Sequence, residues 1–225
     1  MSKGKSKRTV TIPKWCICTE GKTEELYLRA YCIDLGIQDI IDINSDSCDC
    51  ISSGSGCGRQ HKALIDQVQI CNKKSKYGRM IIIHDFDSSG DKGKAAAFDE
   101  TSQTGKSTGI FVFYSIPCFE YWLLLHNNYI DSNLSVAECA KKVKEFINAK
   151  RKEQGKELLH GARYKTDADI YLYFHGQEGT EQAIKNAKKR FENSEMPQKP
   201  SSVQPSSNLY LLFEQLKELS ESRSK

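Results

Sequence analysis

The stretch RMIIIHDFD, residues 79–87, decides the fold. Its middle holds four successive apolar residues, Met80 to Ile83. A strand that is apolar on both faces is typical of a parallel sheet covered by helices on both sides. The apolar part ends at Asp85 and Asp87, so two acidic side chains stand at the strand's carboxyl end. We therefore expect an α/β protein whose buried strands end on charged residues.

The same pattern repeats on the N-terminal side of this strand. KWCICTE, residues 14–20, is a short apolar run that ends at Glu20, and the residues after it have helical spacing as far as Gly36. IQDIIDINS, residues 37–45, predicts another strand, and RQHKALIDQVQICNKK, residues 59–74, predicts the helix that follows it. Strands and helices thus alternate up to the deciding stretch.

The alternation continues on the C-terminal side. A polar, glycine-containing segment, residues 88–109, leads to the strand GIFVFYSIP, residues 109–117, and then to the apolar helix CFEYWLLLH, residues 118–126. Such alternation predicts a parallel sheet with right-handed crossovers, and ligands of such sheets bind at the carboxyl ends of the strands. The expected fold class is α/β, a Rossmannoid parallel sheet with a C-terminal helical appendage.

Three segments are expected along the 225 residues. Residues 1–12 are basic and predicted to be disordered, residues 13–130 to form the α/β domain, and residues 131–225 to form a helical region packed on it. Lysine-rich helices at 141–152 and 185–190 are interpreted as solvated faces, with a nucleic-acid backbone as the alternative partner.

Composition limits the function classes. The net charge of +4 permits contact with phosphates but does not establish it. No apolar run approaches the roughly 18 residues that span a bilayer, and the first ten residues lack the apolar core of a signal peptide. We expect a cytoplasmic protein with no membrane partner. Its nine cysteines are then reduced thiols, several of them buried, and Cys16, Cys18 and Cys71 have apolar neighbours.

Three acidic residues end two of the predicted strands: Glu20, Asp85 and Asp87. If the strands are neighbours, these carboxylates lie within reach of one cation, and Asp85 and Asp87 share a face because they are two residues apart. Like charges at such spacing need a cation or a proton between them, and Mg²⁺ prefers carboxylate oxygens. The alternative is that the acids are turn formers or helix caps, most of all Asp87 before SSG.

Four motifs resemble known families. TEGKTEE, residues 19–25, followed by IIIHDFDSSG, residues 81–90, resembles the Toprim signature of topoisomerases, primases and OLD-type nucleases. SIPCFEYWLLLH, residues 115–126, and PSSNLYLLFEQL, residues 205–216, are similar to segments of the RloB-like family, Toprim proteins associated with restriction and phage-defence loci. This resemblance spans nearly the whole chain and implies a Toprim-like fold. His84 and Ser88 depart from the usual Toprim pattern and leave the number of metal ions open.

The resemblance also implies roles for the acidic residues. Glu20, Asp85 and Asp87 would hold Mg²⁺ or Mn²⁺, and Glu24 could hold a second ion, although a helix-start glutamate also fits the helix dipole equally well. Glu120 stands among apolar residues, where a lone carboxylate is costly, so we expect it in the active site. The alternative for Glu120 is an exposed acid in the first turn of a helix.

Cations are expected near the scissile phosphate. Lys165, in ARYKTDADI, is similar to a lysine-bearing segment of the family and is the expected catalytic cation. Arg163 competes with it, and Lys22 lies in the turn between the two glutamates, so both are candidates for substrate binding. The alternative for Lys165 is an ordinary solvated loop lysine. His84 is interpreted as a structural histidine rather than a general acid or base.

Three further motifs have weaker interpretations. Cys48, Cys50, Cys57 and His61 have ligand types suited to zinc but irregular spacing, so zinc is not the favoured interpretation. The SGSGCG stretch, residues 53–58, could cradle a phosphate but lacks the Walker pattern, and it is interpreted as a flexible loop. GKSTG, residues 105–109, imitates part of a P-loop, but it precedes a strand instead of following one, so nucleotide binding is not expected there.

The function predicted from these features is metal-dependent cleavage of phosphodiester bonds in DNA, tRNA or another RNA, as an effector of anti-phage defence. The family resemblance implies a companion ABC-type ATPase, because the chain has no nucleotide-hydrolysis motif of its own. The alternative is a non-catalytic module that senses nucleic acid or a nucleotide and docks on such an ATPase. A topoisomerase or primase is disfavoured by the chain's size. The oligomeric state is open, with a homodimer as one possibility.

Overall fold

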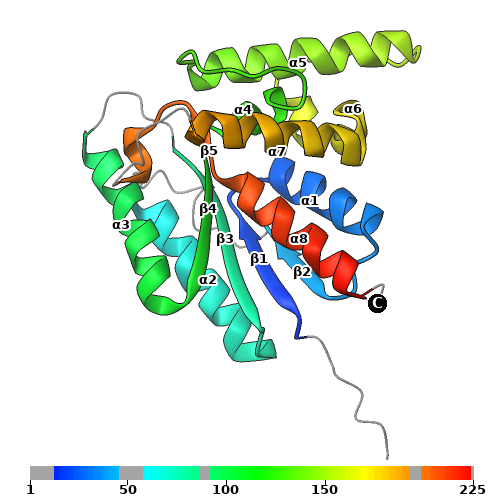
Figure 1. The fold of residues 1–225 in the computed structure, drawn as a ribbon. Helices are drawn as coiled ribbons and strands as arrows, with labels where there is room; N and C mark the ends of the chain where they lie inside the picture. The colour runs from blue at the N-terminus through cyan, green and yellow to red at the C-terminus, as the bar shows by residue number, and fades with distance from the viewer. Residues whose placement is uncertain (1–12, 46–57, 87–91, 193–198, 224–225) are drawn as a thin grey trace, which may run out of the picture.

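A five-stranded sheet forms the centre of the molecule (Figure 1). The computed structural model describes residues 13–45, 58–86, 92–192 and 199–223, and at 58–62 and 92–94 it describes the backbone only. In sheet order the strands are β2 (Ile41–Asn44), β1 (Trp15–Thr19), β3 (Arg79–Asp85), β4 (Ile110–Ile116) and β5 (Ser206–Ser207). The first four are parallel and β5 is antiparallel to β4. The predicted α/β class with a parallel sheet is confirmed.

Helices cover both faces of the sheet because the strand side chains alternate between two apolar cores. Ile17 and Ile81 belong to the core beneath α1 (Lys22–Asp34) and α8 (Leu209–Arg223). Cys18 and Ile82, on the opposite face, belong to a second core with residues of α2 (Gly58–Ser75). Helix α3 (Lys92–Thr108) packs beside α2 on that face (Figure 1).

A group of helices lies over the carboxyl ends of the parallel strands (Figure 1). It contains α4 (Phe119–Leu124), α5 (Val136–Glu153), the 3-10 turn η2 (Arg163–Thr166), α6 (Ile170–Tyr173) and α7 (Gly176–Glu192). Helix α5 begins with a capping box in which the Ser135 hydroxyl accepts from the Glu138 N–H while the Glu138 carboxylate accepts from the Ser135 N–H. The predicted helical C-terminal region is thus confirmed, and it encloses the sheet edge where the acidic residues are expected.

Two segments contain more regular structure than the sequence pattern specified. Most of the polar segment 88–109 is the helix α3, whose Gly105 lies so close to β4 that an added Cβ would meet Val112 Cγ2 at 2.2 Å. The GKSTG motif is the end of this helix. The loop expected before the last helix contains the 3-10 turn η3 (Pro200–Ser202) and β5. Strand β5 pairs with the end of β4, and the Ser207 and Ser115 hydroxyls lie 2.9 Å apart.

The ends of the chain and its division into domains remain predictions from the sequence. Residues 1–12 lie outside the described residues, and the division of the chain at residue 130 stays a prediction. Among the described helices, none combines the length and apolar character that crossing a bilayer requires.

Candidate metal centre

Glu20 and Asp85, two of the predicted ligands, meet at the carboxyl ends of neighbouring strands. Strands β1 and β3 pair with Thr19 opposite Ile83, so Glu20 comes directly after β1 beside the last residues of β3. Glu20 Oε2 accepts a hydrogen bond from the backbone N–H of Asp85 at 3.0 Å. Burial raises the pKa of the Glu20 carboxyl despite this hydrogen bond. The parallel register thus brings the two carboxyl groups to one edge of the sheet.

The Asp85 carboxylate has an unsatisfied oxygen. Its Oδ1 is buried and accepts no hydrogen bond from the described residues. The backbone N–H of Phe119, the first residue of α4, donates to this carboxylate. Burial raises the pKa of Asp85 well above its usual range, and the charges of Glu24, Glu20 and Glu120 raise it further. A buried oxygen without a partner among like charges is an arrangement that a bound cation would stabilise.

Glu24 points into the same cluster from the first turn of α1. Its side chain is buried, with the residue only 4% exposed, and it lies against Gly21, where an added Cβ would meet Glu24 Oε2 at 2.7 Å. Burial raises the pKa of Glu24 to about 8, and the neighbouring Glu20 and Glu120 contribute to the rise. A solvated acid that served only the helix dipole would show neither feature.

Glu120 is the fourth carboxylate, and it has a cation as its partner. It is 2% exposed, so the alternative of an exposed helix-start acid is wrong. Burial alone would raise the pKa of Glu120, but the Lys165 ammonium 2.8 Å away and the Tyr164 hydroxyl 2.7 Å away hold it below the usual value. Among the four described carboxyl groups of the cluster, Glu120 is therefore the one whose pKa is lowered, because it has a cation as its partner.

Lys165 reaches the cluster from η2. Burial acts to lower the pKa of its ammonium, but Glu120, followed by Glu24 and Asp85, raises it above the usual value. The backbone carbonyl of Lys165 accepts a hydrogen bond from the Thr23 hydroxyl at 3.2 Å, which ties η2 to α1. The lysine side chain is 45% exposed, so one side of it is open to solvent. A lysine paired with a buried glutamate is not an ordinary solvated loop lysine.

Tyr164 is a member of the site that the sequence did not reveal. Its hydroxyl donates to Glu120 Oε1 at 2.7 Å, and burial followed by the Glu120 charge raises its pKa above the usual range. The only signal in the sequence was its position beside Lys165 in ARYKTDADI. In a 3-10 turn, adjacent residues point in different directions, so that position alone could not predict a shared partner.

The two cations predicted to bind substrate lie outside this cluster's contacts. Lys22 is exposed, and its ammonium pairs with Glu25 Oε2 at 2.9 Å. Glu25 also pairs with Arg29, and these pairs together with a Ser45 hydrogen bond hold the pKa of Glu25 below its usual value despite partial burial. Arg163 is exposed at the start of η2. Their roles in substrate binding stay predictions.

Of the other residues singled out in the sequence, several lie outside the described residues and His84 lies inside the protein. Asp87, Cys48, Cys50 and Cys57 lie outside the described residues, and the side chain of His61 does too, so the possible zinc cluster stays a prediction. His84 is fully buried, with its ring centroid 4.6 Å from that of Phe98 on α3. This is the environment expected of a structural histidine.

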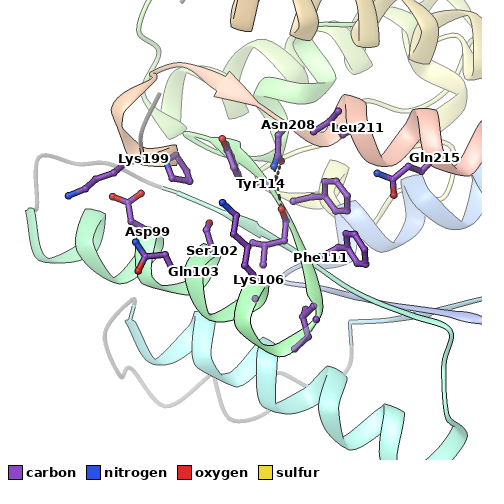
Figure 2. A pocket seen from close by; sticks show the side chains of 16 residues that line it. Asp99, Ser102, Gln103, Lys106, Phe111, Tyr114, Lys199, Asn208, Leu211 and Gln215 are labelled. Atoms are coloured by element: carbon purple, nitrogen blue, oxygen red, sulfur yellow. Dashed lines mark hydrogen bonds between the residues drawn. The ribbon is translucent and has the colours of Figure 1, made fainter. Parts of the chain in front are cut away.

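A cavity of about 540 Å³ lies elsewhere, between α3, β4 and the start of α8 (Figure 2). Lys106, Tyr114 and Asn208 are among its lining residues, and as the described residues define it, none of the predicted site residues lines it. Asn208 covers part of the β4 edge there: its Oδ1 accepts from the Tyr114 N–H at 2.6 Å and its Nδ2 donates to the Val112 carbonyl at 3.3 Å. The cavity is therefore separate from the carboxylate cluster.

The donor set of the cluster fits a hard divalent cation. Glu20, Glu24, Asp85 and Glu120 offer only carboxylate oxygens, the ligands that Mg²⁺ and Mn²⁺ prefer. In the part of the chain that the structure describes, no three of them have ligand atoms that all lie within 4.8 Å of one another. The arrangement is thus open, and among the described residues nothing donates a hydrogen bond to Oδ1 of Asp85, which makes it the atom that a cation would stabilise most.

Comparisons with known proteins identify one family. The family model described as "RloB-like protein" matches residues 15–216. No curated protein matches the chain. Among solved structures, the C-terminal region of the OLD protein of Xanthomonas campestris pv. campestris matches with a TM-score of 0.35 and 14% identity, over 96% of this chain and 99% of that one. A TM-score of this size carries no argument about activity.

Proposed function

The chain belongs to the RloB-like protein family, and on that premise we propose that it is a metal-dependent nuclease that cleaves phosphodiester bonds in RNA or DNA. The observation that carries the proposal is the buried Oδ1 of Asp85, which accepts no hydrogen bond from the described residues although the charges of Glu24, Glu20 and Glu120 act on this carboxyl group. Such a concentration of carboxyl groups destabilises the folded protein unless protons or a bound cation balance their charge, and a bound cation gives the cluster a function.

Glu20 and Asp85 would hold the cation, with Asp87 as the further ligand expected from the sequence and Glu24 beside them. Bound there, Mg²⁺ or Mn²⁺ would neutralise phosphate charge and make a water molecule more acidic. Each carboxylate would exchange a stabilising proton for the cation's charge. These residues would therefore bind the cation and fix its position, and the cation would balance their negative charge.

Lys165 would contact a phosphate oxygen of the substrate. Its ammonium is charged, partly exposed and fixed by Glu120 at 2.8 Å, while Tyr164 fixes the same Glu120 oxygen. A positioned cation stabilises the charge that develops on the phosphate during cleavage. Glu120 and Tyr164 are positioning residues in this scheme, because they act through the lysine.

Substrate and partner belong to the same proposal. We propose DNA, tRNA or other RNA as the substrate. We also propose an ABC-type ATPase as the partner that supplies nucleotide hydrolysis, and an effector role in defence against phages. The support for these is the family membership and the resemblance of the motifs.

The test is cleavage of tRNA, single-stranded DNA and duplex DNA by the purified protein with Mg²⁺, Mn²⁺ or EDTA, with and without the proposed ABC-type ATPase partner. Asp85→Asn removes one charge at nearly constant volume, and we expect it to reduce cleavage at least about 100-fold. Asp42→Asn is the matched control, because Asp42 lies on β2 beside Tyr77 and outside the cluster. Metal-independent nucleic-acid binding without cleavage under every condition would support the sensing module instead.

A further inference from the structure

Three cysteines meet between β1 and α2. The sulfur atoms of Cys16 and Cys18 on β1 and of Cys71 on α2 all lie within 4.8 Å of one another. In the part of the chain that the structure describes, this is the single group of three His, Cys, Asp or Glu ligands with that spacing. Cys16 and Cys18 are two residues apart on a strand, so both point to the face that α2 covers.

The surroundings of the three sulfur atoms are apolar on the inside and accessible at one side. Cys16 and Cys18 are fully buried in the core that also contains Leu64, Val68 and Ile82. Cys71 is only partly buried, so the group has one side close to solvent. An ion could therefore reach the sulfur atoms without unfolding the sheet.

Two amide side chains donate hydrogen bonds to the sulfur atoms. Asn44 Nδ2 lies 3.7 Å from Cys16 Sγ, and Gln67 Nε2 lies 3.8 Å from Cys71 Sγ. Donors of this kind around a metal site orient the ligands and stabilise the negative charge of a thiolate. Cysteines that served only as small apolar core residues would have no need of these polar neighbours.

We propose that Cys16, Cys18 and Cys71 bind a single thiophilic d¹⁰ cation, Zn²⁺ or Cu⁺, as a structural ion between β1 and α2. Metal–sulfur bonds of about 2.3 Å would place three sulfur atoms about 4 Å apart, which is inside the 4.8 Å within which the three sulfur atoms lie. On binding, each coordinating thiol releases its proton to solvent and its sulfur donates an electron pair to the ion. No atom changes oxidation state.

This site would be independent of the proposed nuclease activity. The ion would fix β1 to α2, which covers the face of the sheet opposite α1. Glu20 directly follows β1, so the ion would also help to hold the strand end that leads to Glu20. The ion would therefore stabilise the folded chain even in a variant whose carboxylate cluster has been removed.

The test uses the full chain, reduced and freed of metal, in titrations with Zn²⁺ and separately with Cu⁺ against a competing chelator. We expect one equivalent of ion to bind and the Tm to rise. Cys71→Ser should weaken binding at least about tenfold. Cys32→Ser is the matched control, because Cys32 is buried on α1 in the other core. The combined Cys48→Ser, Cys50→Ser, Cys57→Ser variant should keep the ion, and its loss there would overturn the proposal.

If Cys71→Ser fails to fold, X-ray absorption of the wild-type protein loaded with the ion identifies the atoms that coordinate it. Three sulfur atoms at about 2.3 Å from Zn²⁺, or a similar sulfur shell around Cu⁺, would support the site. The ion that the chain retains against the chelator would be the one that the site prefers. Absence of stoichiometric binding, a shell of nitrogen and oxygen atoms, or unchanged affinity in folded Cys71→Ser would overturn it.

Discussion

Asp85 and its neighbours illustrate how single carboxyl groups in one cluster can differ. Glu120 has Lys165 and Tyr164 as partners, and its pKa stays low despite burial. Glu20 and Asp85 are joined by a hydrogen bond at the strand ends, Glu24 lies near them on α1, and among the described residues none of the three has an ion pair; burial raises the pKa of each. In the absence of metal, the raised pKa values favour protons at the place that we assign to a divalent cation.

The pH dependence of stability follows from these shifts. Burial raises the folded-state pKa of Glu24 from the ordinary 4.5 to about 8, so the folded protein binds more protons than the unfolded chain in that window. Its stability should therefore fall as the pH rises toward 8. Buried His126, with its pKa lowered by burial from 6.5 to about 3, gives the opposite slope below pH 6.5. The effect of Glu24 on stability is therefore best measured between pH 6.5 and 8, where the opposing effect of His126 is absent.

In thermal denaturation with EDTA, we expect the Tm to fall by about 3–6 °C per pH unit for each excess proton in that range. Glu24→Gln should reduce the slope, and Mg²⁺ should reduce it in the wild-type protein because the cation replaces protons. A Tm that stays level or rises between these pH values in EDTA would show that the carboxyl groups are not buried together.

For individual residues of the site, the sequence predicted the acidic residues at the strand ends but not all of their partners. Glu20 and Asp85 were predictable because parallel strands place their carboxyl ends at one edge. Glu120 and Lys165 were candidates from burial cost and family resemblance, but their 2.8 Å contact joins α4 to a 3-10 turn 45 residues later. No periodicity in the sequence encodes such a contact, and the same holds for Tyr164.

Among the secondary-structure elements, η2 matters most for the site, because this short turn carries Lys165. The Thr23 hydroxyl holds it from α1, and Arg151 on α5 holds the residue that follows it, Asp167, at 2.7 Å. Arg151 also donates to the Tyr173 hydroxyl at 2.9 Å. Both members of the Arg151–Asp167 pair are largely buried, so the pair is screened less than a surface salt bridge.

Arg151→Met should therefore reduce cleavage by about tenfold, since it loosens the turn that positions Lys165 while leaving every carboxylate in place. The effect should appear in kcat at unchanged metal affinity. Lys150→Met is the matched control, because Lys150 is the neighbouring residue and its ion pair, at 3.4 Å, is with exposed Glu153 rather than with a residue beside η2. Equal activity of the two variants would mean that η2 needs no support from α5.

Elements were predictable where the apolar pattern was long enough. β3, with four successive apolar residues, gave a clear signal, whereas the two-residue β5 has no period to detect. Helix α3 was obscured by its polar and small residues, which pack through Gly105 against β4. Short or weakly amphipathic elements owe their structure to tertiary contacts that a local pattern does not contain.

On the scale of the whole molecule, the last helix completes the core of the first strands. Phe213 on α8 stacks on Trp122 of α4 with ring centroids 4.8 Å apart and nearly parallel planes. Tyr27 of α1 contacts the same phenylalanine edge-on at 5.7 Å. One core cluster thus extends from Ile17 to Leu216, and the helical C-terminal region shares it with the sheet.

Phe213→Ala should lower the free energy of unfolding by about 3–5 kcal/mol, because it leaves a cavity among aromatic rings that cannot collapse. Leu211→Ala on the same helix is the matched control: Leu211 is 40% exposed, and we expect a change within about 0.5 kcal/mol. Denaturant unfolding of both variants measures the difference. A small effect of Phe213→Ala would mean that α8 is not part of the common core.

The central claim is that the carboxyl groups at the end of β1 and β3 hold a divalent cation, and Mn²⁺ binding tests it most directly. Electron paramagnetic resonance of free Mn²⁺, titrated into wild-type protein and into Asp85→Asn, reports binding without any substrate. We predict that the wild-type chain removes Mn²⁺ from solution stoichiometrically and that Asp85→Asn binds it at least about tenfold more weakly. Equal binding by the two proteins, or none by the wild type, would contradict the claim.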